Sequence, residues 1–448
     1  MWGIQLGLLR KDLKNMKTLL KYSLAIILFV NFCSGIQAQA ERTQDFIESW
    51  DGMHNVSIDH RYGTLEIIPH AGAEVRLKAQ ILVHAKEEAD ARILIDHFEI
   101  KTSTSGDKLK IETKFNTKSW TTINNNTKIK FSDGSKVSGI KKIEIKYKLH
   151  VPALEMLEIS NKYNDIELTS DYTGDLTVKL YDATLHTKNI SGSLNLNLKY
   201  GKAYIGSVGD VEMNIYDSKV EISISKNVNI KSKYSGIKLG EMNSARIDSY
   251  DGYCKIGKVT GELQITDKYS TYEIESAEDV NASMYDGKMR LDKATNYTGS
   301  SKYSTYDFNE IGSIDLKSVH DDHFNIQSLR IFSCDESKYT SFEIESLAEK
   351  AIILSSYDDE LSVSVVKASF THFEIDCKYT SVRLPLNALS GYLINAKMKY
   401  GKLSYAEPTD HIVHKEYNEQ LELRAQVGDS SSIAKVIING YDSNIRLK

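Results

Sequence analysis

The segment His320-Asp321-Asp322-His323 places two imidazoles and two carboxylates at four consecutive positions. Imidazole and carboxylate groups suit divalent cations, so this segment is the strongest candidate for a metal site in the sequence. His411 and His414 form a second, weaker candidate. The competing interpretation is structural, because His320 and Asp321 occupy the positions of a repeated Tyr-Asp motif. We favour the structural interpretation in both places and predict no bound metal.

A second set of candidate residues is a series of aspartates that recurs at regular spacing. Each follows a tyrosine or its substitute: Asp182, Asp217, Asp251, Asp286, Asp321 and Asp358. On alternate rungs of a stacked fold their carboxylates would be about 9–10 Å apart, near the upper limit for an inverting glycosidase. Catalysis needs two carboxylates in different environments, whereas these repeat in similar ones. We therefore predict a structural role, no catalytic residues and no cofactor, and we expect the cluster Asp358-Asp359-Glu360 to be solvated.

The aspartates belong to a motif that recurs about every 17 or 18 residues from Tyr163 to Lys448, in two alternating forms. One form is Lys-Tyr followed by a small residue, beginning at Lys162, Lys199, Lys233, Lys268, Lys302 and Lys338. The other is Tyr-Asp, beginning at Tyr181, Tyr216, Tyr250, Tyr285 and Tyr357. A fixed period of this size is typical of stacked repeat architectures.

Apolar residues alternate with polar ones after each motif, which is the period of a β-strand. The first inward residues of successive repeats are 166, 185, 203, 220, 237, 254, 272, 289, 306, 324, 342, 361, 382, 403 and 445. Each repeat has room for two main strands, such as 280–284 and 288–291. The sequence thus predicts an all-β, single-chain parallel β-solenoid (β-helix) with rungs of 17–18 residues.

The length of one coil follows from the charges at the motif. In rungs of 17–18 residues, Lys of one form stacks on Tyr of the other, and Tyr stacks on Asp, about 4.8 Å away. A coil of 35 residues would instead stack Lys on Lys and Asp on Asp. Like charges directly opposite are destabilising, whereas a cation over an aromatic ring is favourable. We therefore predict the shorter rung.

The region 41–152 lacks the repeat and is predicted to be an N-terminal cap with the first rung. Arg61-Tyr62-Gly63, with Leu65 and Ile67, forms a single isolated repeat. A helix is expected over 86–98, and a loop or irregular hairpin over 117–138. Residues 153–448 form the solenoid, whose last repeat is interrupted by an insertion near 407–432. Such segments cover rung edges that would otherwise promote aggregation.

The first 40 residues resemble a Sec-type signal peptide. Lys17 and Lys21 precede the apolar run 24–32, which is too short to span a bilayer, and Ala38-Gln39-Ala40 is a small-x-small cleavage site. Met16 is an alternative initiator. The competing interpretations are a membrane anchor and a lipoprotein attached through Cys33. No later segment approaches 18 uninterrupted apolar residues, so no transmembrane segment is expected in the mature chain.

Cleavage after Ala40 would leave Cys254, Cys334 and Cys377. Each lies in or beside a predicted strand, and no C-x-x-C spacing suggests zinc. We expect them to be buried small hydrophobic residues rather than a disulfide or a reactive thiol. The net charge of −5 gives no basic field for nucleic acid. No G-x-S-x-G, H-E-x-x-H or P-loop string is present.

The order of these features resembles an adhesin family of exported Gram-negative bacterial proteins, related to auto-transporter adhesin head GIN domains. The matching parts are the signal, the segment 61–67, the helix-bearing region, His150-Val151-Pro152, and the segment 161–166 that opens the repeats. Asn164 stands where such repeats commonly carry Gly. The resemblance implies a β-solenoid with a surface or periplasmic role, and it brings no catalytic residues.

We therefore expect an exported, non-enzymatic, adhesin-like protein in the periplasm, at the outer-membrane surface or outside the cell. Its expected partner is a protein or glycan of the cell envelope. The alternative is a carbohydrate-active β-helix enzyme, such as a polysaccharide lyase or hydrolase. The short, even turns argue against that alternative, because they leave little wall for a catalytic groove. A third reading is a purely structural or assembly protein without a soluble ligand.

Overall fold

The computed structural model describes residues 40–124 and 126–448, so the predicted signal peptide, apart from Ala40, lies outside the described residues. Of the described residues, 73% lie in strands and 2% in a helix. It divides into two compact units. One holds the described residues up to Ile47 with Lys78–Ile100 and Thr113–Lys146; the other holds Glu48–Leu77, Lys101–Glu112 and Tyr147–Lys448. Among the described residues, no helix has the length and apolar character needed to cross a membrane.

The smaller unit is rich in strands and contains the one helix of the described ranges, α2 (Glu88–Asp96), close to the predicted position. Its strands come from β1 (Ala40–Asp51), β4 (Glu74–Ala85), β5 (Phe98–Ser105), β7 (Thr117–Ile123), β8 (Asn126–Phe131) and β9 (Lys136–Val151). β7 and β8 form an antiparallel hairpin, and β8 pairs with β9. The polar stretch predicted as a loop or irregular hairpin is therefore a hairpin. Most of the β7 side chains are exposed, which explains why no apolar alternation marks this strand.

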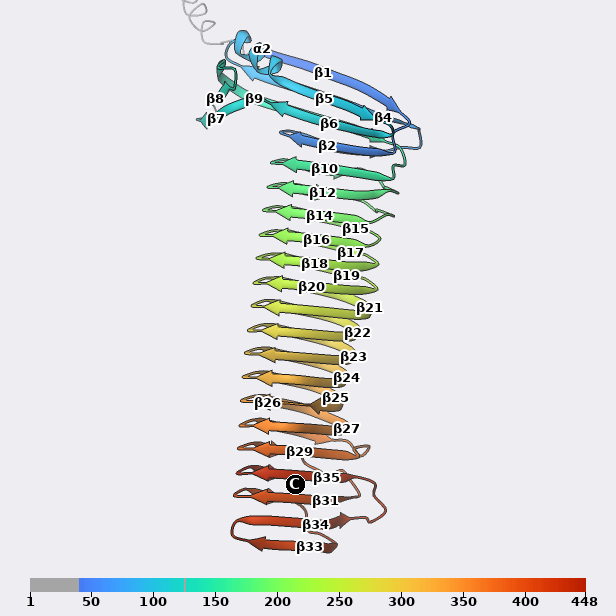
Figure 1. Ribbon diagram of the computed structural model, residues 1–448, viewed down its shortest axis with the longest axis vertical. Helices are drawn as coiled ribbons and strands as arrows, with labels where there is room; N and C mark the ends of the chain where they lie inside the picture. Colours follow the sequence, from blue (N-terminus) through green and yellow to red (C-terminus); the bar gives the residue numbers. More distant parts are fainter. Residues whose placement is uncertain (1–39, 125) are drawn as a thin grey trace, which may run out of the picture. The chain divides into compact units, whose positions relative to one another are not determined.

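The larger unit is a parallel β-solenoid. The first strands of its early rungs are β2 (Asn55–Arg61), β10 (Met156–Lys162), β12 (Asp175–Tyr181), β14 (Leu194–Lys199), β16 (Val211–Tyr216), β18 (Asn227–Lys233) and β20 (Ser244–Tyr250). The second strands are β3 (Thr64–Pro69), β11 (Ile166–Leu168), β13 (Thr184–His186), β15 (Lys202–Ser207), β17 (Lys219–Ile224) and β19 (Gly236–Glu241). Figure 1 shows these strands stacked one above another.

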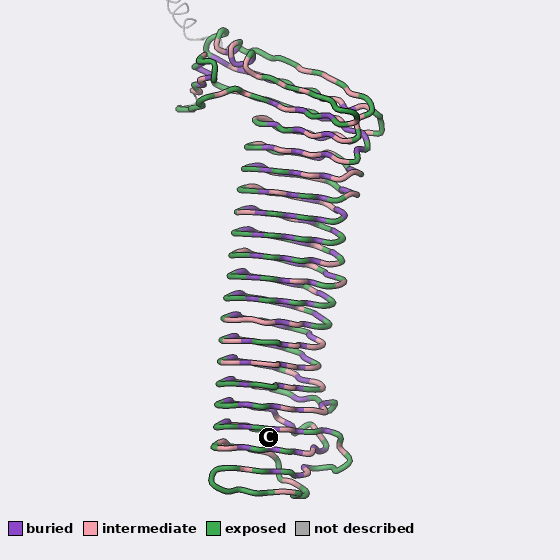
Figure 2. The backbone as a smooth tube through the Cα atoms, in the orientation of Figure 1, coloured by how far each residue is buried: buried purple, intermediate pink, exposed green. Residues whose placement is uncertain are grey.

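Later strands are longer, because the second strand of one rung continues into the first strand of the next. These are β21 (Tyr253–Lys268), β22 (Thr271–Tyr285), β23 (Lys288–Lys302), β24 (Thr305–His320), β25 (His323–Cys334) with β26 (Ser337–Lys338), and β27 (Ser341–Tyr357). They are followed by β28 (Glu360–Val366), β29 (His372–Lys378) and β30 (Ser381–Arg383). Figure 2 shows buried and exposed residues alternating along the rungs, as expected for strands around one core.

The register confirms the predicted rung length. Leu185 pairs with Ile166 and Ala203, and Cys254 pairs with Ile237 and Tyr272. The isolated repeat also joins the stack, because Leu65 pairs with Ile166. β2 pairs on its other side with residues 108–112 of β6 (Lys108–Phe115). A coil of 35 residues is excluded by these pairings.

The core is a set of inward columns that run along the solenoid. Ile274 is 2% exposed, and every inward position of the predicted series up to 382 is buried. Aromatic side chains stack in one column, where the rings of Tyr306 and Phe324 lie 4.3 Å apart at an interplanar angle of 4°. Phe342 continues this stack at 5.3 Å from Phe324. Such stacks add to the stabilisation that burial alone provides.

Where the third residue of the motif is Ser or Thr, its hydroxyl has a defined role at the corner. The Ser218 hydroxyl donates to the Tyr216 carbonyl at 2.8 Å and accepts from the Gly201 amide at 3.2 Å. The same arrangement links Ser235 to Ser218 and Ser443 to Thr380. The motif therefore encodes a hydrogen-bonded corner that repeats from rung to rung.

The order of the last rungs differs from the order in the sequence. β29 pairs with β35 (Lys435–Tyr441), and β35 pairs on its other side with β31 (Gly391–Lys399). The second strands agree, since β36 (Asn444–Arg446) pairs with both β30 and β32 (Lys402–Ser404). The C-terminal rung thus lies between two rungs that precede it in the chain (Figure 1). The predicted order 382, 403, 445 was wrong, and the observed order is 382, 445, 403.

The insertion near 407–432 forms a hairpin at this end of the solenoid. β34 (Gln420–Gly428) pairs antiparallel with β31, and β33 (Asp410–Tyr417) pairs antiparallel with β34. β33 carries Asp410, His411, His414, Lys415 and Glu416, all exposed. Charged residues on an outer strand disfavour pairing with another chain. The expectation that this insertion covers the final rung edge is confirmed.

Candidate functional site

The corner of each rung is a residue in the left-handed backbone region. In Tyr-Asp corners this residue is the aspartate, such as Asp217 with a φ of 45°. In Lys-Tyr corners it is the tyrosine, such as Tyr163 with a φ of 73° and Tyr269 with a φ of 70°. Aspartate tolerates this conformation, but a bulky aromatic residue adopts it at a cost of order 1–3 kcal/mol. The tyrosines at these corners therefore adopt a backbone conformation that is unfavourable for an aromatic residue.

The tyrosines of both corner types form one continuous ladder. Adjacent rings lie 5.3–6.2 Å apart at interplanar angles of 67–90°. In order, the ladder is Tyr163, Tyr181, Tyr200, Tyr216, Tyr234, Tyr250, Tyr269, Tyr285, Tyr303, His320, Tyr339, Tyr357, Tyr379, Tyr441 and Tyr400. Edge-to-face contacts of this kind contribute about 0.5–1.5 kcal/mol each beyond burial. We call this row of rings the tyrosine ridge.

The ridge corrects one detail of the predicted corner packing. Lys and Tyr do alternate in register, as in the pairing of Tyr250 with Lys233 and Lys268. The tyrosine rings, however, do not pack on the lysines of the adjacent rungs. Each ring packs on the tyrosines that follow those lysines, as Tyr250 does on Tyr234 and Tyr269. The cation–aromatic contacts present join sequence neighbours, with Lys302 Nζ 4.8 Å from the Tyr303 ring centre and Lys399 Nζ 4.9 Å from that of Tyr400.

The ridge is accessible to solvent along its length. Tyr163 is 52% exposed, Tyr269 43% and Tyr400 47%, so each ring offers a large apolar surface. The partial burial and the neighbouring phenol and aspartate groups raise the pKa of Tyr200, Tyr234, Tyr269 and Tyr379. These side chains therefore stay neutral hydrogen-bond donors at neutral pH.

Shallow grooves flank the ridge where tyrosines of alternate rungs form the walls. One of about 440 Å³ lies between Tyr200 and Tyr234 and includes Asp182, Asp217 and Lys202. Another of about 500 Å³ is bounded by Tyr303, Tyr339 and Tyr379. Alternate rungs are about 9–10 Å apart, so the same set of aromatic, acidic and hydroxyl groups recurs at that interval.

Three residues of the metal candidate, His320, Asp321 and Asp322, are engaged in contacts of the corner itself. His320 takes the place of a tyrosine in the ridge, and its Nδ1 lies 2.5 Å from Asp321 Oδ2. Asp322 is buried, and it accepts hydrogen bonds from the Ser304 and His320 amides at 2.6 and 2.9 Å. His411 and His414 pack against each other on β33. Within the described residues, no group of three or more His, Cys, Asp or Glu side chains is arranged to hold a metal ion.

The buried aspartates are structural groups that the sequence did not distinguish. Asp359 is 6% exposed and accepts from the Ser356 hydroxyl at 2.6 Å and the Thr340 amide at 2.8 Å. The expectation that the cluster 358–360 is solvated was therefore wrong for this residue. Burial raises the pKa of Asp322 to about 6 and also raises that of Asp359 and Asp267. These carboxylates are buried and accept hydrogen bonds from protein donors, which favours a structural role for them.

The three cysteines among the described residues, Cys254, Cys334 and Cys377, are buried and unlinked, as expected. Burial raises the pKa of Cys254 and Cys334 to about 12 and that of Cys377 to about 11. A thiol with so high a pKa is almost entirely protonated at neutral pH and is a poor nucleophile. Nothing in these positions suggests redox or nucleophilic chemistry.

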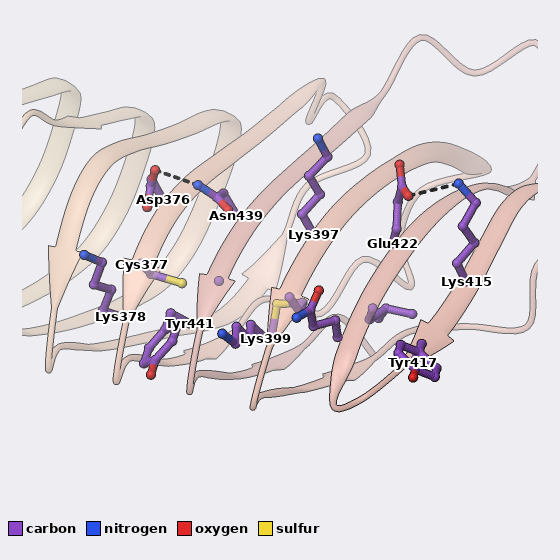
Figure 3. Close-up of a pocket in the computed structure, with 14 residues that line it drawn as sticks. Asp376, Cys377, Lys378, Lys397, Lys399, Lys415, Tyr417, Glu422, Asn439 and Tyr441 are labelled. Carbon is purple, nitrogen blue, oxygen red and sulfur yellow. Dashed lines mark hydrogen bonds and ion pairs between the residues drawn. The ribbon is translucent and has the colours of Figure 1, made fainter.

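A larger groove lies at the C-terminal end of the solenoid, on strands β29, β35, β31, β34 and β33 (Figure 3). It has a volume of about 570 Å³ and is bordered by two rows of outward side chains. One row, in strand order, is Asp376, Asn439, Lys397, Glu422 and Lys415. The other is Lys378, Tyr441, Lys399, Gln420 and Tyr417. We call this site the C-terminal groove.

Comparison with known proteins gives matches only at the level of solved structures. No family model matches the chain, and no curated protein matches it. A "putative adhesin" from Bacteroides fragilis NCTC 9343 aligns at 12% identity over 62% of this chain and 97% of its own, with a TM-score of 0.29. A "putative adhesin" from Parabacteroides merdae ATCC 43184 aligns at 11% identity over 75% of this chain and 97% of its own, with a TM-score of 0.24.

A third solved structure, a "putative lipid binding protein" from Parabacteroides distasonis ATCC 8503, aligns at 11% identity over 75% of this chain and 97% of its own, with a TM-score of 0.21.

Proposed function

We propose that this chain is an exported, non-enzymatic, adhesin-like protein that binds an extended glycan of the cell envelope along its tyrosine ridge. The observation that carries the proposal is the placement of exposed tyrosines at left-handed corners, where Asp, Asn or Gly would be less strained. Strained residues that persist in a fold are concentrated at functional positions. The matched solved structures are consistent with this proposal, but it does not depend on them.

The spacing of the ridge favours a glycan over a protein partner. Corner tyrosines of the same type recur every second rung, about 9–10 Å apart, which is close to the length of an extended disaccharide unit. Tyrosine offers both an apolar ring face and a hydroxyl, and the adjacent aspartates and hydroxyls accept or donate hydrogen bonds. A repeating polymer could thus make the same contacts at several successive positions. Such multivalency gives useful avidity from weak single contacts.

The arrangement argues against catalysis on that glycan. The outward aspartates repeat in equivalent corners, and the aspartates with raised pKa face the interior. A glycosidase needs an acid and a base or nucleophile that both reach one glycosidic bond. The grooves beside the ridge are shallow, so they cannot exclude water from a reacting bond.

The test is binding of the intact protein to an array of bacterial envelope glycans. We expect binding that is lost in the triple variant Tyr234→Leu/Tyr269→Leu/Tyr303→Leu and retained in Tyr253→Leu, which removes a tyrosine 42% exposed outside the ridge. Thermal melting checks that the triple variant is folded. No reducing ends or unsaturated sugars should appear on incubation. A folded triple variant that binds like the parent would refute the role of the ridge.

A further inference from the structure

The C-terminal groove differs from the rest of the surface in its charge. Four lysines line it, against two carboxylates, whereas the whole chain has a net charge of −5. Both carboxylates are already engaged. Asp376 accepts from Asn439 Nδ2 at 2.8 Å, and Glu422 pairs with Lys415 Nζ at 3.3 Å (Figure 3). The groove is therefore a positively charged depression on an acidic protein.

Three lysines of the groove have no carboxylate partner among the residues that the structure describes: Lys378, Lys397 and Lys399. Lys397 and Lys399 lie on one strand, two positions apart, so both ammonium groups project outward from β31. Lys378 lies on β29, and β35 separates the two strands. Two strand spacings place Lys378 about 9–10 Å from Lys399. Lysines without a carboxylate partner at this spacing can hold anionic groups on successive units of one ligand.

Tyrosines border the same groove. Tyr441 is directly between Lys378 and Lys399 in the strand register, and it is 36% exposed. Tyr417, at the end of the hairpin strand β33, is 77% exposed. The hairpin turn that follows it has left-handed φ values of 50° and 60° at Asn418 and Glu419. This turn is anchored to the last corner, because the Tyr400 amide donates to the Glu419 carbonyl at 2.8 Å.

We propose that the C-terminal groove is a second binding site, specific for an acidic saccharide whose negative charge is carried by a carboxylate or a sulfate ester. The volume of about 570 Å³ suits a ligand of one to a few sugar units. The lysines provide the charge complement, and the tyrosines provide apolar faces for sugar rings. The site shares Tyr441 with the ridge, but its charged residues come from strands at one end of the solenoid, away from Tyr234, Tyr269 and Tyr303.

The experiment measures affinity of the intact protein for three probes of similar length by isothermal titration: oligogalacturonate, a heparin-derived oligosaccharide, and a neutral maltooligosaccharide. We expect at least one acidic probe to bind, with affinity that falls as salt is raised, and the neutral probe to bind at least tenfold more weakly. The acidic probe that binds more tightly identifies the charged group. Binding of neither acidic probe, or equal binding of the neutral one, would overturn the proposal.

Variants locate the site. Lys397→Gln/Lys399→Gln should weaken acidic binding by about fivefold for each lysine lost. The matched control is Lys231→Gln/Lys233→Gln, which alters the same two positions of a mid-solenoid strand, β18, and should leave the affinity unchanged. Equal loss in both double variants would show that charge along the whole solenoid, and not the groove, is responsible. The ridge variant Tyr234→Leu/Tyr269→Leu/Tyr303→Leu should retain acidic binding, so failure of one site is distinguishable from failure of the other.

Discussion

Val382 is directly opposite Ile445 in the parallel sheet, although the two residues are far apart in the chain and Leu403 is the next residue of the same column in sequence. Ile445 lies between them and completes the hydrophobic column. Along the chain, the rung 391–404 and the hairpin β33–β34 come first. The C-terminal segment 435–446 follows them in sequence but lies between the rung 391–404 and the rung that contains Val382. The C-terminal segment has hydrogen-bonded neighbours on both sides, so it connects the terminal rung and hairpin to the rest of the solenoid.

The first prediction concerns this inserted rung. Ile438 is 2% exposed between Ile375 and Ala396, so Ile438→Asp places a charge in the core and should cost several kcal/mol. Interfaces between rungs are nearest-neighbour interactions, so the damage should concentrate in residues 384–448. Limited proteolysis should show new cleavage there, while the preceding rungs remain protected.

The control for this prediction is Asn439→Ser, at the adjacent outward position. It removes the hydrogen bond to Asp376 but leaves the core intact, so its proteolysis pattern should match that of the parent. If the Ile438→Asp protein were instead cleaved evenly along the whole solenoid, the rungs would not behave as nearest-neighbour units.

A second prediction separates the core from the surface in the middle of the solenoid. Ile274→Asp should sharply lower the melting temperature, or yield protein cleaved near this rung, because an unpaired charge would be buried. Lys268→Ala should melt almost normally. Lys268 is exposed and the tyrosines of the ridge pack on one another, so the loss should be below about 1 kcal/mol. Equal melting of the two variants would contradict the inward assignment of Ile274.

The repeat made most of the solenoid predictable from sequence. The corner motif marks each rung, and strict alternation identifies the inward columns, as at Ile237, Cys254 and Tyr272. Both signals can be read within a single repeat. They hold for the whole solenoid because its rungs are nearly equal in length and stack in parallel. The hairpin β7–β8 was harder to define, because its strands are largely exposed and carry no apolar period.

The rung order was missed although the sequence contains a signal for it. Two Lys-Tyr corners follow one another at Lys378 and Lys399, and a Tyr-Asp corner comes last at Tyr441. In chain order Lys378 would stack on Lys399, which the alternation disfavours. Placing Tyr441 between them restores the alternation, and this is the observed register. The ridge and the C-terminal groove both depend on contacts between rungs, which the sequence of one repeat does not contain.

A third prediction concerns the thiols. Because Cys254, Cys334 and Cys377 are buried and their pKa values are raised to about 11 or 12, the folded protein should react very slowly with a thiol reagent at pH 8. In guanidinium chloride the same protein should react rapidly at all three residues. Rapid stoichiometric labelling of the folded protein would contradict the buried placement.

The last prediction concerns pH and the buried carboxylate of Asp322. Its pKa is raised to about 6 from 3.8 by burial, so between these values the folded state binds more protons than the unfolded state. The free energy of unfolding from this group must therefore fall as pH rises from about 4 to about 6. The change is on the order of 2–3 kcal/mol. Asp322→Asn removes the titrating group. As pH rises, the variant should therefore become more stable relative to the parent.

His60 makes the free energy of unfolding depend on pH in the opposite direction, and it does so equally in the parent and in Asp322→Asn. Burial lowers the pKa of His60 to about 4, so its contribution to stability is lost as pH falls from 6.5 towards 4. Comparing denaturant unfolding of parent and Asp322→Asn at pH 4.5, 5.5 and 6.5 cancels that contribution. The substitution also lowers stability by an amount that does not depend on pH. An amide side chain can accept only some of the hydrogen bonds that the carboxylate accepts from Ser301, Ser304 and His320. The prediction therefore rests on the slope of the difference: a constant difference across these pH values would show that Asp322 does not titrate in this range.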